Sequence, residues 1–448
     1  MYSNYFKSLK YLDSIKDLPL KDYMKDKRVD PIIYIKRTEY LLNLLDNPQK
    51  DFKFIHVTGT SGKGSTCSLI HNILTQAKFK AGLFLSPHTT TIIQRIKVGD
   101  KYISPNQFAN LTNFLKPYIL ECHENSPYGR PSYFEIILAL VLLYFKQQKC
   151  KYVVLEVGCG GMYDATNVIP RSKISIITNI DLEHTRILGK TLTAIAKDKA
   201  GIIKHDSYFI TKETRLKILK IFKDVCRKKK TKFIQIQPEI EEIKHTLDGT
   251  YFKFRNNPQK YFSGLIGKHQ VYNSAIAIEV AKKLKIPNKH ILAGLKKTKL
   301  PCRFEVIKKK PLIILDGAHN PAKMKSLTNN LKHLEYERLC LIIGIKEKKD
   351  KRRMLKQIIP YTDKIFVASV KKGMQDKQYL QKFKKSVTNI DNGLKPKIFF
   401  NPRKALDQAL KEVKAKDLIL VTGSLYLTGE IREKWFLENY ILKNRKSF

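Results

Sequence analysis

The spacing of apolar residues along the chain predicts an α/β protein. Short runs rich in Val, Ile, Leu and Phe have the length of buried strands, and between them apolar positions recur at helical spacing. Helices are predicted, for example, at residues 132–147 and 192–199. In the first half the predicted strands are 54–57, 80–85, 152–157, 174–179, 208–211 and 233–237, followed by a hairpin-like segment at 249–254. Alternating strands and helices indicate mostly parallel sheets covered by helices.

A second run of this kind begins at about Pro301, after a helix predicted from about Asn288 to Lys299. Five short strands are predicted there, at 311–315, 339–345, 364–370, 395–400 and 417–424. No G-x-G-x-x-G follows a strand, so a dinucleotide fingerprint is missing. We therefore predict a P-loop-type ATP-binding domain at 1–299 and a smaller Rossmann-like domain at 300–448.

A glycine-rich segment between the first predicted strand and a helix carries the clearest chemical signal. Residues 58–65 read TGTSGKGS. Backbone N–H groups of such a turn converge on an anion, and the helix dipole favours negative charge. Lys63 adds a cation for phosphates, and Ser65 or Thr66 adds a hydroxyl for Mg²⁺. We interpret the segment as a nucleoside triphosphate site rather than a flexible turn.

This segment departs from the P-loop motif G-x-x-x-x-G-K-[ST] at two positions. Val57 stands at the first glycine, and Gly64 stands where the hydroxyl residue is expected. The preceding strand, the lysine and the neighbouring hydroxyls together still favour a phosphate site.

Further candidate residues follow later strands. Glu156 ends a predicted strand and is followed by the glycines of GCGG, which places a carboxylate where it can hold Mg²⁺ in the same sheet as the phosphate loop. Glu183 and His184 follow the next strand, and Lys199 precedes a glycine. Taken singly, these residues could be an edge carboxylate, a structural histidine and a solvated lysine. The segment 315–321, LDGAHNP, supplies Asp316, His319 and Asn320 at a helix start.

Composition narrows the class of protein. The chain is 43% apolar and 10% aromatic, which is typical of a folded protein. It has no apolar run long enough to span a bilayer and no N-terminal secretion signal. Its seven scattered cysteines contain no C-x-x-C pair, so we expect reduced thiols, a cytoplasmic location and no membrane partner.

The net charge of +45 would by itself suggest nucleic acid as a partner. The lysines are spread along the whole chain, with dense runs only at 228–230 and 346–353. No aromatic-interleaved basic stripe accompanies them. We therefore interpret the charge as a lysine-rich solvated surface that attracts anionic substrates, and expect no specific nucleic-acid partner.

These motifs, in this order, resemble folylpolyglutamate synthase/dihydrofolate synthase of the Mur ligase superfamily, over about residues 11–432. The family's G-T-N-G-K-G-S corresponds to residues 59–65, with Ser61 replacing Asn. Its other motifs correspond to S-P-H at 86–88, Y-F-E at 133–135, L-E-V-G-x-G-G-x-x-D-A-T-N at 155–167, L-D-H-T at 182–185, E-K-A-G-I at 198–202, G-x-H-Q-x-x-N at 267–273, R-F-E at 303–305, D-G-A-H-N-P at 316–321 and T-G-S-L-Y-L at 422–427.

The resemblance implies two Mg²⁺ ions between the phosphates and the protein. Ser65 and Glu156 would hold one ion, and Ser86, Glu156 and His184 the other. The family's carbamylated lysine corresponds to Lys199. Carbamylation turns a cation into a carboxylate, which explains a lysine placed beside Mg²⁺.

The resemblance also implies the substrate contacts. Those to ATP would come from both domains, so that domain closure completes the site: Gly59, Thr60, Gly62, Lys63, Gly64, Ser65, Thr66, Asn273, Arg303 and Asp316. Those to a pteroate group would be Ser132, Tyr133, Phe134, Glu135, Tyr163, Asp164 and Ala165.

The implied reaction is ATP-dependent amide formation on a monomeric enzyme. The acceptor carboxylate attacks the γ-phosphate to give an acyl phosphate, with Lys63 offsetting charge, and the amine of L-glutamate then attacks the acyl carbon. His319 would lie near that amine or its carboxylate. Met162 replaces a common Arg and Cys159 a frequent Leu, and Met162 and Tyr163 are expected at the acceptor pocket. Dihydropteroate and reduced folate therefore both stay open as acceptors.

Two other functions remain as alternatives. Another Mur-type ligase would act on a cell-wall nucleotide precursor, but the phosphate loop begins only about 58 residues into the chain, which argues against an extra nucleotide-binding domain before it. A basic nucleic-acid-binding protein on a vestigial ATPase fold would not be expected to keep the whole set of candidate ligands.

Overall fold

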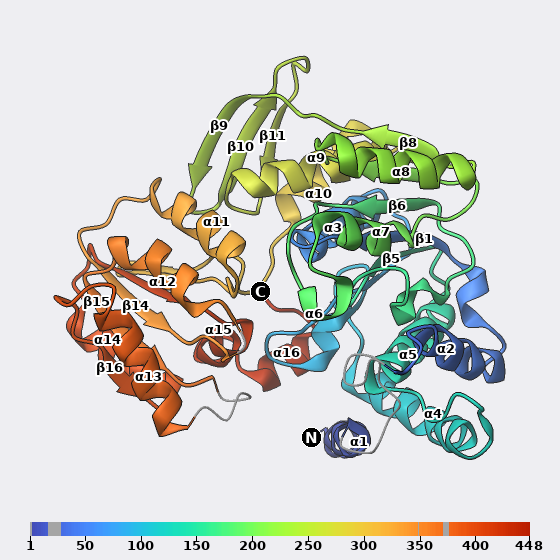
Figure 1. Cartoon of the computed structure of the whole chain (residues 1–448), viewed down its shortest axis with the longest axis horizontal. Coiled ribbons are helices and arrows are strands. Elements are labelled where there is room, and N and C mark those ends of the chain that lie inside the picture. The colour runs from blue at the N-terminus through green and yellow to red at the C-terminus, as the bar shows by residue number, and fades with distance from the viewer. Residues whose placement is uncertain (1, 17–27, 348, 371–375) are drawn as a thin grey trace. The chain divides into compact units, whose positions relative to one another are not determined.

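The computed structural model describes residues 2–16, 28–347, 349–370 and 376–448, and the chain forms two compact units (Figure 1). The first unit comprises Met1–His88, Ile92–Glu239 and Tyr272–Lys297, and the second Thr89–Thr91, Ile240–Val271 and Thr298–Phe448. The predicted domains, 1–299 and 300–448, differ from these units because Ile240–Val271 groups with the second. Ile266 is buried in the core of that unit, and Leu247 packs against the same core.

The sheet of the first unit has eight strands in the order β4-β3-β2-β5-β1-β6-β7-β8. All neighbours are parallel except for the antiparallel pairs β2–β3 and β3–β4 at one edge. The strands are β1 (Lys53–Thr58), β2 (Ala81–Phe84), β3 (Ile96–Val98), β4 (Lys101–Tyr102), β5 (Tyr152–Glu156), β6 (Ile174–Ile177), β7 (Tyr208–Thr211) and β8 (Lys232–Gln235). The six strands predicted for this region are confirmed.

Helices cover this sheet, and two glycines allow close packing. In α10 (Asn288–Lys297), a Cβ atom at Gly294 would lie 2.5 Å from the Ile73 Cα of α3 (Lys63–Gln76). In β2, a Cβ at Gly82 would lie 2.8 Å from the ring of Phe145 in α5 (Tyr133–Gln147). The other helices that begin in or enter this unit are α1 (Ser3–Lys16), α2 (Ile33–Leu44), α4 (Pro105–Asn125), α6 (Thr185–Leu188), α7 (Leu192–Ala200), α8 (Leu216–Lys228) and α9 (Lys268–Lys283), with 3-10 turns η1 (Pro48–Asp51), η2 (Ile92–Arg95) and η3 (Ala165–Val168).

The main sheet of the second unit has the order β12-β13-β17-β14-β15-β16, and only β12 is antiparallel to its neighbour. The strands are β12 (Glu305–Lys309), β13 (Leu312–Leu315), β14 (Leu339–Ile343), β15 (Lys364–Ala368), β16 (Lys397–Phe399) and β17 (Leu418–Thr422). The five predicted strands are confirmed as β13 to β17, and β12 was not predicted.

Alternate residues of these strands enter two apolar clusters, one on each face of the sheet. Helices α11 (Pro321–Leu331), α12 (Lys351–Ile358) and α13 (Lys377–Thr388) contribute to one cluster. Helices α14 (Pro402–Glu412) and α15 (Leu425–Arg432) contribute to the other, and the 3-10 turn η4 (Ile359–Tyr361) and α16 (Glu438–Asn444) complete the unit. The arrangement is the predicted α/β layer structure.

A separate antiparallel sheet of three strands also belongs to the second unit. Its order is β11-β10-β9, with β9 (Ile240–Thr246), β10 (Gly249–Phe254) and β11 (Lys260–Ser263). The segment 249–254 was predicted to be hairpin-like and is instead one strand, because it pairs along its length with a strand on each side. None of the helices in the described ranges is long and apolar enough to cross a membrane. All seven cysteines are free thiols.

A buried ion pair fixes the start of α5 to α2. The Arg37 Nε donates to Glu135 Oε2 at 3.0 Å, and its Nη2 donates to Oε1 at 2.8 Å. Both side chains are almost fully buried, at 0% and 1% exposed. Glu135 also accepts the backbone N–H of Ser132 at 2.7 Å as part of a capping box. The carboxylate therefore joins a helix cap to a neighbouring helix.

We predict that Arg37→Met lowers the free energy of unfolding by about 3–5 kcal/mol, because it leaves a buried carboxylate without its countercharge. Chemical denaturation of wild type and variant measures this difference in the free energy of unfolding. The double variant Arg37→Met/Glu135→Gln should recover much of the loss.

The matched control lies on the same helix. Lys36 forms an exposed pair with Glu39, at 3.2 Å and with both side chains more than 40% exposed. Lys36→Met should cost less than about 1 kcal/mol. Equal losses for Lys36→Met and Arg37→Met would contradict the role given to the buried pair.

Candidate active site

The phosphate loop connects β1 to α3, and its backbone requires glycine at two positions. Gly59 has φ +145° and Gly62 has φ +83°. A Cβ at Gly59 would lie 1.9 Å from Thr178 Oγ1, and one at Gly62 would lie 2.6 Å from Asn273 Oδ1 of α9. Both the backbone conformation and the surrounding space therefore exclude a side chain.

The residues that follow β6 hold this loop in place. Asn179 accepts the N–H of Thr60 on its backbone oxygen at 3.1 Å and the N–H of Ser61 on Oδ1 at 2.8 Å. The Thr178 hydroxyl donates to Ser61 O at 2.6 Å, and the Asp181 N–H donates to Thr60 Oγ1 at 3.0 Å. The β6 connection is thus fixed to the phosphate loop just before it reaches Glu183 and His184.

Glu156, at the end of β5, lies beside the first turn of α3. The side chain is 4% exposed, and its Oε2 accepts the backbone N–H of Ser86 at 2.9 Å. Its carboxylate oxygens would lie 3.6 Å from a Cβ at Gly64. Lys63 bends back over the loop and donates to Gly59 O at 2.7 Å. The structure therefore brings Glu156, Ser86 and the lysine-bearing loop together.

The donor atoms here fit a hard divalent cation. They are carboxylate and hydroxyl oxygens, the ligands that Mg²⁺ prefers beside phosphate and water. Ser65 is 6% exposed, and the hydroxyl of fully buried Thr66 has no hydrogen-bond partner in the described chain. Within the described ranges, no three His, Cys, Asp or Glu side chains gather as a metal site. Mg²⁺ would thus depend on hydroxyls and substrate oxygens as well as Glu156.

Lys199 lies on α7 with 2% of its surface exposed. Burial and, to a smaller extent, the positive charge of Lys63 lower the pKa of its amine to about 8, while Glu183 and Asp198 act in the opposite direction. The loop after β5 packs directly on this helix, because a Cβ at Gly161 would lie 2.8 Å from the Lys199 Cα. Lys199 is therefore a buried lysine near the phosphate loop, in contrast to the solvated lysines of the surface.

His184, unlike the buried Lys199, lies at the surface of the first unit. It is exposed, has φ 52° and caps the short helix α6. Its left-handed backbone conformation turns the chain after Thr178 to Asp181, the residues that hydrogen-bond to the phosphate loop. The structure places His184 on the loop next to Glu183, whose charge acts on Lys199.

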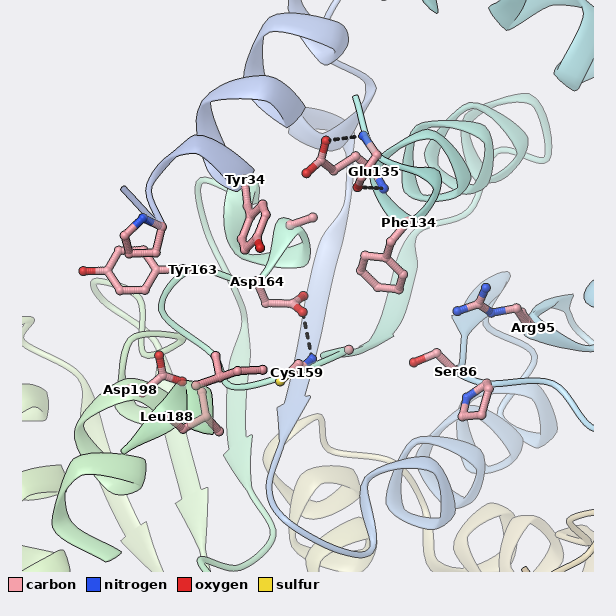
Figure 2. A pocket seen from close by; sticks show the side chains of 16 residues that line it. Tyr34, Ser86, Arg95, Phe134, Glu135, Cys159, Tyr163, Asp164, Leu188 and Asp198 are labelled. Carbon is pink, nitrogen blue, oxygen red and sulfur yellow. Dashed lines mark hydrogen bonds between the residues drawn. The ribbon is translucent and has the colours of Figure 1, made fainter. Parts of the chain in front are cut away.

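A pocket of ≈ 470 Å³ opens beside these residues (Figure 2). It is lined by Ser86 and by six of the seven predicted acceptor-binding residues: Ser132, Phe134, Glu135, Tyr163, Asp164 and Ala165. Tyr133 does not line it. The sequence reading missed other lining residues, among them Tyr34 of α2, Arg95 of η2, Leu188 of α6 and Asp198 of α7.

Two of the lining carboxylates are occupied by internal hydrogen bonds. Glu135 is bound by Arg37 and Ser132, and Asp164 accepts the N–H groups of Cys159 at 2.9 Å and Thr166 at 3.0 Å. Burial raises the pKa of both carboxyl groups, and these hydrogen bonds oppose the shift. Glu135 and Asp164 therefore shape the pocket wall.

Asp198 differs from these two residues. Its Oδ1 is buried and has no hydrogen-bond partner in the described chain, and burial raises the pKa of the carboxyl group to about 6. Figure 2 shows Asp198 and Tyr163 on one side of the pocket and Ser86 and Arg95 on the other. Asp198 thus places a carboxyl group on one side of the pocket, and Arg95 places a guanidinium group on the other.

Cys159 and Met162, which depart from the family motif, and the neighbouring Tyr163 do not all line the pocket. Tyr163 and Cys159 line the pocket, whereas Met162, which was also expected there, does not line it and is 39% exposed. The Met162 backbone N–H donates to Asp198 O at 2.9 Å. Met162 thus contacts α7 through its backbone.

The second unit carries its own set of predicted residues after β13. Asp316 is held by two backbone N–H groups, with Phe304 donating to Oδ2 and Ala318 to Oδ1, both at 2.8 Å. Burial raises the pKa of Asp316, and Arg303 opposes the shift. Ser424 caps α15, the helix after β17. These residues lie after neighbouring parallel strands, where α/β sheets bind ligands.

His319 is engaged on both ring nitrogens. Its Nδ1 lies 2.8 Å from Gly317 O, and its Nε2 lies 3.0 Å from the Nζ of Lys323. Burial, and then the charge of Lys323, lower the pKa of the imidazole well below its ordinary value. The motif reading did not single out Lys323, because a lysine is unremarkable in a chain with 85 basic residues.

Comparisons with known proteins agree with this geometry. The Mur ligase middle domain family matches residues 57–281, and the Mur ligase glutamate ligase domain family matches residues 302–425. A dihydrofolate synthase/folylpolyglutamate synthase of Bacillus subtilis is 30% identical over 415 residues, which cover 89% of this chain and 94% of that protein.

Solved structures extend the similarity to almost the full chain. The crystal structure of folylpolyglutamate synthase from Thermotoga maritima has a TM-score of 0.80 at 29% identity, covering 99% of this chain and 98% of that one. A complex of FPGS with AMPPCP and folate has a TM-score of 0.79 at 28% identity, covering 96% and 99%. The chain therefore belongs to the Mur ligase family and, within it, to the folylpolyglutamate synthase/dihydrofolate synthase group of ATP-dependent glutamate ligases.

Proposed function

We propose that this protein joins L-glutamate to a folate-type acceptor in an ATP-dependent reaction. The observation that carries the proposal is the convergence of Glu156, Ser86 and the phosphate loop beside a pocket that Ser86 also lines. Such an arrangement suits transfer of a phosphoryl group to an acceptor bound in that pocket. The relatives named as folylpolyglutamate synthases, one of them in complex with AMPPCP and folate, support the same substrates.

The roles of the loop residues follow from their chemistry. The backbone N–H groups of Gly59 to Ser65 and the first turn of α3 bind the phosphates, and Lys63 offsets charge on the transferring group. Ser65, Ser86, Glu156 and His184 would hold Mg²⁺, which supplies charge neutralisation of the phosphate oxygens. The acceptor carboxylate attacks the γ-phosphorus and ADP leaves; the glutamate amine then attacks the acyl carbon, loses a proton and expels phosphate.

Lys199 is proposed to act as a carbamate. A neutral amine is the form that adds CO₂, with release of one proton, and a pKa of about 8 makes that form accessible near neutral pH. The product carries a negative charge, which suits a buried position near the cation of Lys63. A cationic Lys199 would instead repel Mg²⁺.

The acceptor pocket suits a flat heterocycle with N–H donors. The ring of Phe134 packs against Gly158, where a Cβ would lie 3.0 Å from Phe134 Cζ. Asp198 offers a buried oxygen without a partner for ring N–H groups, and Arg95 offers a cation for a carboxylate. These features support a pteridine acid as acceptor and leave dihydropteroate and tetrahydrofolate to be separated by experiment.

The decisive assay measures phosphate release with ATP, Mg²⁺ and L-glutamate across three acceptors: dihydropteroate, tetrahydrofolate and a uridine-linked muropeptide. We expect release with one or both pteridines and none with the muropeptide. Turnover with the muropeptide alone would assign the protein to cell-wall synthesis and contradict the proposal.

We predict that Glu156→Gln lowers the ligation rate about a hundredfold or more while the protein stays folded. The amide keeps the shape of the side chain but loses the charge that holds the metal, and a transition-state contact of this kind contributes several kcal/mol. Phosphate release across a Mg²⁺ titration measures the effect, with thermal unfolding as the control for folding. Near-normal turnover at saturating Mg²⁺ would remove Glu156 from the metal site.

Lys199→Ala should be nearly inactive and partly rescued by acetate, because a small carboxylate replaces the one carried by the carbamate. Lys197→Ala is the matched control, since Lys197 is exposed on the same helix and should leave the rate unchanged. Activity of wild-type protein should also depend on bicarbonate. An unmodified Lys199 in a high-resolution structure determined with bicarbonate present would exclude the carbamate.

The net charge of +45 allows a separate prediction. We expect weak, sequence-independent nucleic-acid binding that disappears as salt rises through about 150 mM, because scattered lysines make only screened phosphate contacts. Fluorescence anisotropy with labelled duplex and single-stranded DNA measures this. A specific sub-micromolar complex, together with absence of ATP turnover for every acceptor, would favour nucleic-acid binding as the function.

A further inference from the structure

His56 is a fully buried histidine in β1, the strand that leads into the phosphate loop. Its Nε2 lies 2.9 Å from the hydroxyl oxygen of Thr166, and its Nδ1 has no hydrogen-bond partner among the residues that the structure describes. Burial and, to a smaller extent, the charge of Lys204 lower the pKa of the imidazole to about 3, so the ring is neutral at physiological pH. Because burying a polar ring is unfavourable without hydrogen bonds, the contact with Thr166 offsets part of this cost.

Thr166 connects this histidine to the wall of the acceptor pocket. It is fully buried, and both its hydroxyl and its backbone N–H bind Asp164 Oδ1, at 2.5 Å and 3.0 Å. The other carboxyl oxygen of Asp164 accepts the Cys159 N–H at 2.9 Å, as Figure 2 shows. Since Asp164 lines the pocket, three polar side chains form a continuous chain from the inside of the sheet to the pocket wall.

The donors and acceptors of this chain determine its direction. Hydrogen bonds from N–H and O–H groups favour the charged form of a carboxyl group, and at Asp164 they oppose the rise in pKa that burial causes. With Asp164 as a carboxylate, Thr166 donates its single hydroxyl proton to it, and the hydroxyl oxygen accepts from His56. The ring proton of His56 is therefore on Nε2, and Nδ1 carries only a lone pair.

A second hydrogen bond joins the same face of β1 to the same loop. Side chains alternate between the two faces of a strand, so His56 and Thr58 point to the same side. The Thr58 hydroxyl donates to Gly160 O at 2.6 Å, in the loop that lines the pocket at Cys159 and Asp164. Both links come from the strand whose next residues form the phosphate loop, so β1 holds the pocket wall in place relative to that loop.

We propose that His56 is a positioning residue for the acceptor: it keeps the Thr166 hydroxyl directed at Asp164 and so holds that carboxylate in one orientation on the pocket wall. This inference rests on the proposed function, because it requires a heterocyclic acceptor in this pocket. A wall that is ordered before the acceptor arrives loses less entropy when the acceptor binds. Neither His56 nor Thr166 is among the residues that line the pocket, so both act through Asp164.

Steady-state kinetics of Thr166→Val test the proposal, with dihydropteroate or tetrahydrofolate, ATP and L-glutamate varied in turn. Valine keeps the shape of threonine but lacks the hydroxyl, so the KM for the acceptor should rise about fivefold or more, while the KM values for ATP and L-glutamate stay within about twofold. Thr166→Ser keeps the hydroxyl and should retain most of the affinity. The matched control is Thr112→Val in α4, where a buried hydroxyl donates to Phe108 O at 2.8 Å; it should lower stability and leave every KM unchanged.

Variants of His56 test the first link of the chain. Glutamine can donate a hydrogen bond to Thr166 and leucine cannot, so His56→Leu should raise the acceptor KM as Thr166→Val does, and His56→Gln should rescue most of it. The double variant His56→Leu/Thr166→Val should show no further rise, because both changes break the same chain.

His71 is the matched control for His56. It is equally buried on α3, its Nε2 lies 3.2 Å from Ala81 O, its Nδ1 has no hydrogen-bond partner in the described part of the chain, and its pKa is also lowered to about 3, chiefly by burial. His71→Leu should therefore change thermal stability without changing the acceptor KM. Thermal unfolding of each variant controls for folding.

Nitrogen NMR of wild-type protein with isotope-labelled histidine tests the chain without any change in its residues. The signal of His56, assigned by its loss in His56→Gln, should report the neutral Nε2–H tautomer at neutral pH. An Nδ1–H tautomer would reverse the direction of the chain and overturn the proposal.

Two kinetic outcomes would also overturn it. An unchanged acceptor KM in folded Thr166→Val would separate the chain from acceptor binding, and an equal rise in the KM values for acceptor and ATP would indicate a general loss of structure instead of positioning. Wild-type protein without turnover on either pteridine would contradict the proposed function itself, whereas active wild type with an unaffected Thr166→Val would contradict only this inference.

Discussion

The site depends on the parallel pairing of β1 with a strand on either side. Val57 of β1 is paired with Glu156 of β5, and Thr58 is paired with Ile177 of β6. Because parallel strands end at the same edge, three chain segments leave the sheet at one level. The first becomes the phosphate loop, the second delivers Glu156, and the third begins with the residues that brace the loop. A shift of one residue in either pairing would turn these side chains to the opposite face.

The carboxylates that line the pocket differ in whether their oxygens have hydrogen-bond partners within the protein. Glu135 and Asp164 line the pocket, yet their oxygens are held by Arg37, Ser132 and backbone N–H groups. Asp198 in the same pocket has a buried oxygen without a partner in the described chain. Buried acceptors left in this state cost free energy unless another molecule supplies the donor. The carboxylates of Glu135 and Asp164 thus have their partners within the protein, whereas the Oδ1 atom of Asp198 has none in the described chain.

Sequence patterns predicted the strands that have long apolar runs and missed those that do not. Strands β3 and β4 have three and two residues, too few for a period to appear, and β9 reads IEEIKHT with most positions exposed. Motif spacing predicted the phosphate loop and Glu156, because strand ends and loops are local. Tyr34 and Arg95 reach the pocket from distant parts of the sequence, and nothing in their local pattern marks them. The grouping of Ile240–Val271 likewise follows from the burial of Ile266 in a distant core.

The lysines show most clearly what the sequence alone does not predict, because their environments differ although their residue type is the same. The chain has 85 basic residues, and composition treats Lys63, Lys199 and Lys323 like the rest. Their environments differ: Lys199 is almost fully buried near a second cation, whereas Lys197 on the same helix is exposed. Removing an ammonium group from water is unfavourable, so a protein places lysine in such a position only where another interaction offsets that cost. For Lys199 the carbamate that we propose would offset it. The role of a lysine in this chain therefore depends on how far the fold has buried its ammonium group, and on which protein or substrate groups replace the water around it.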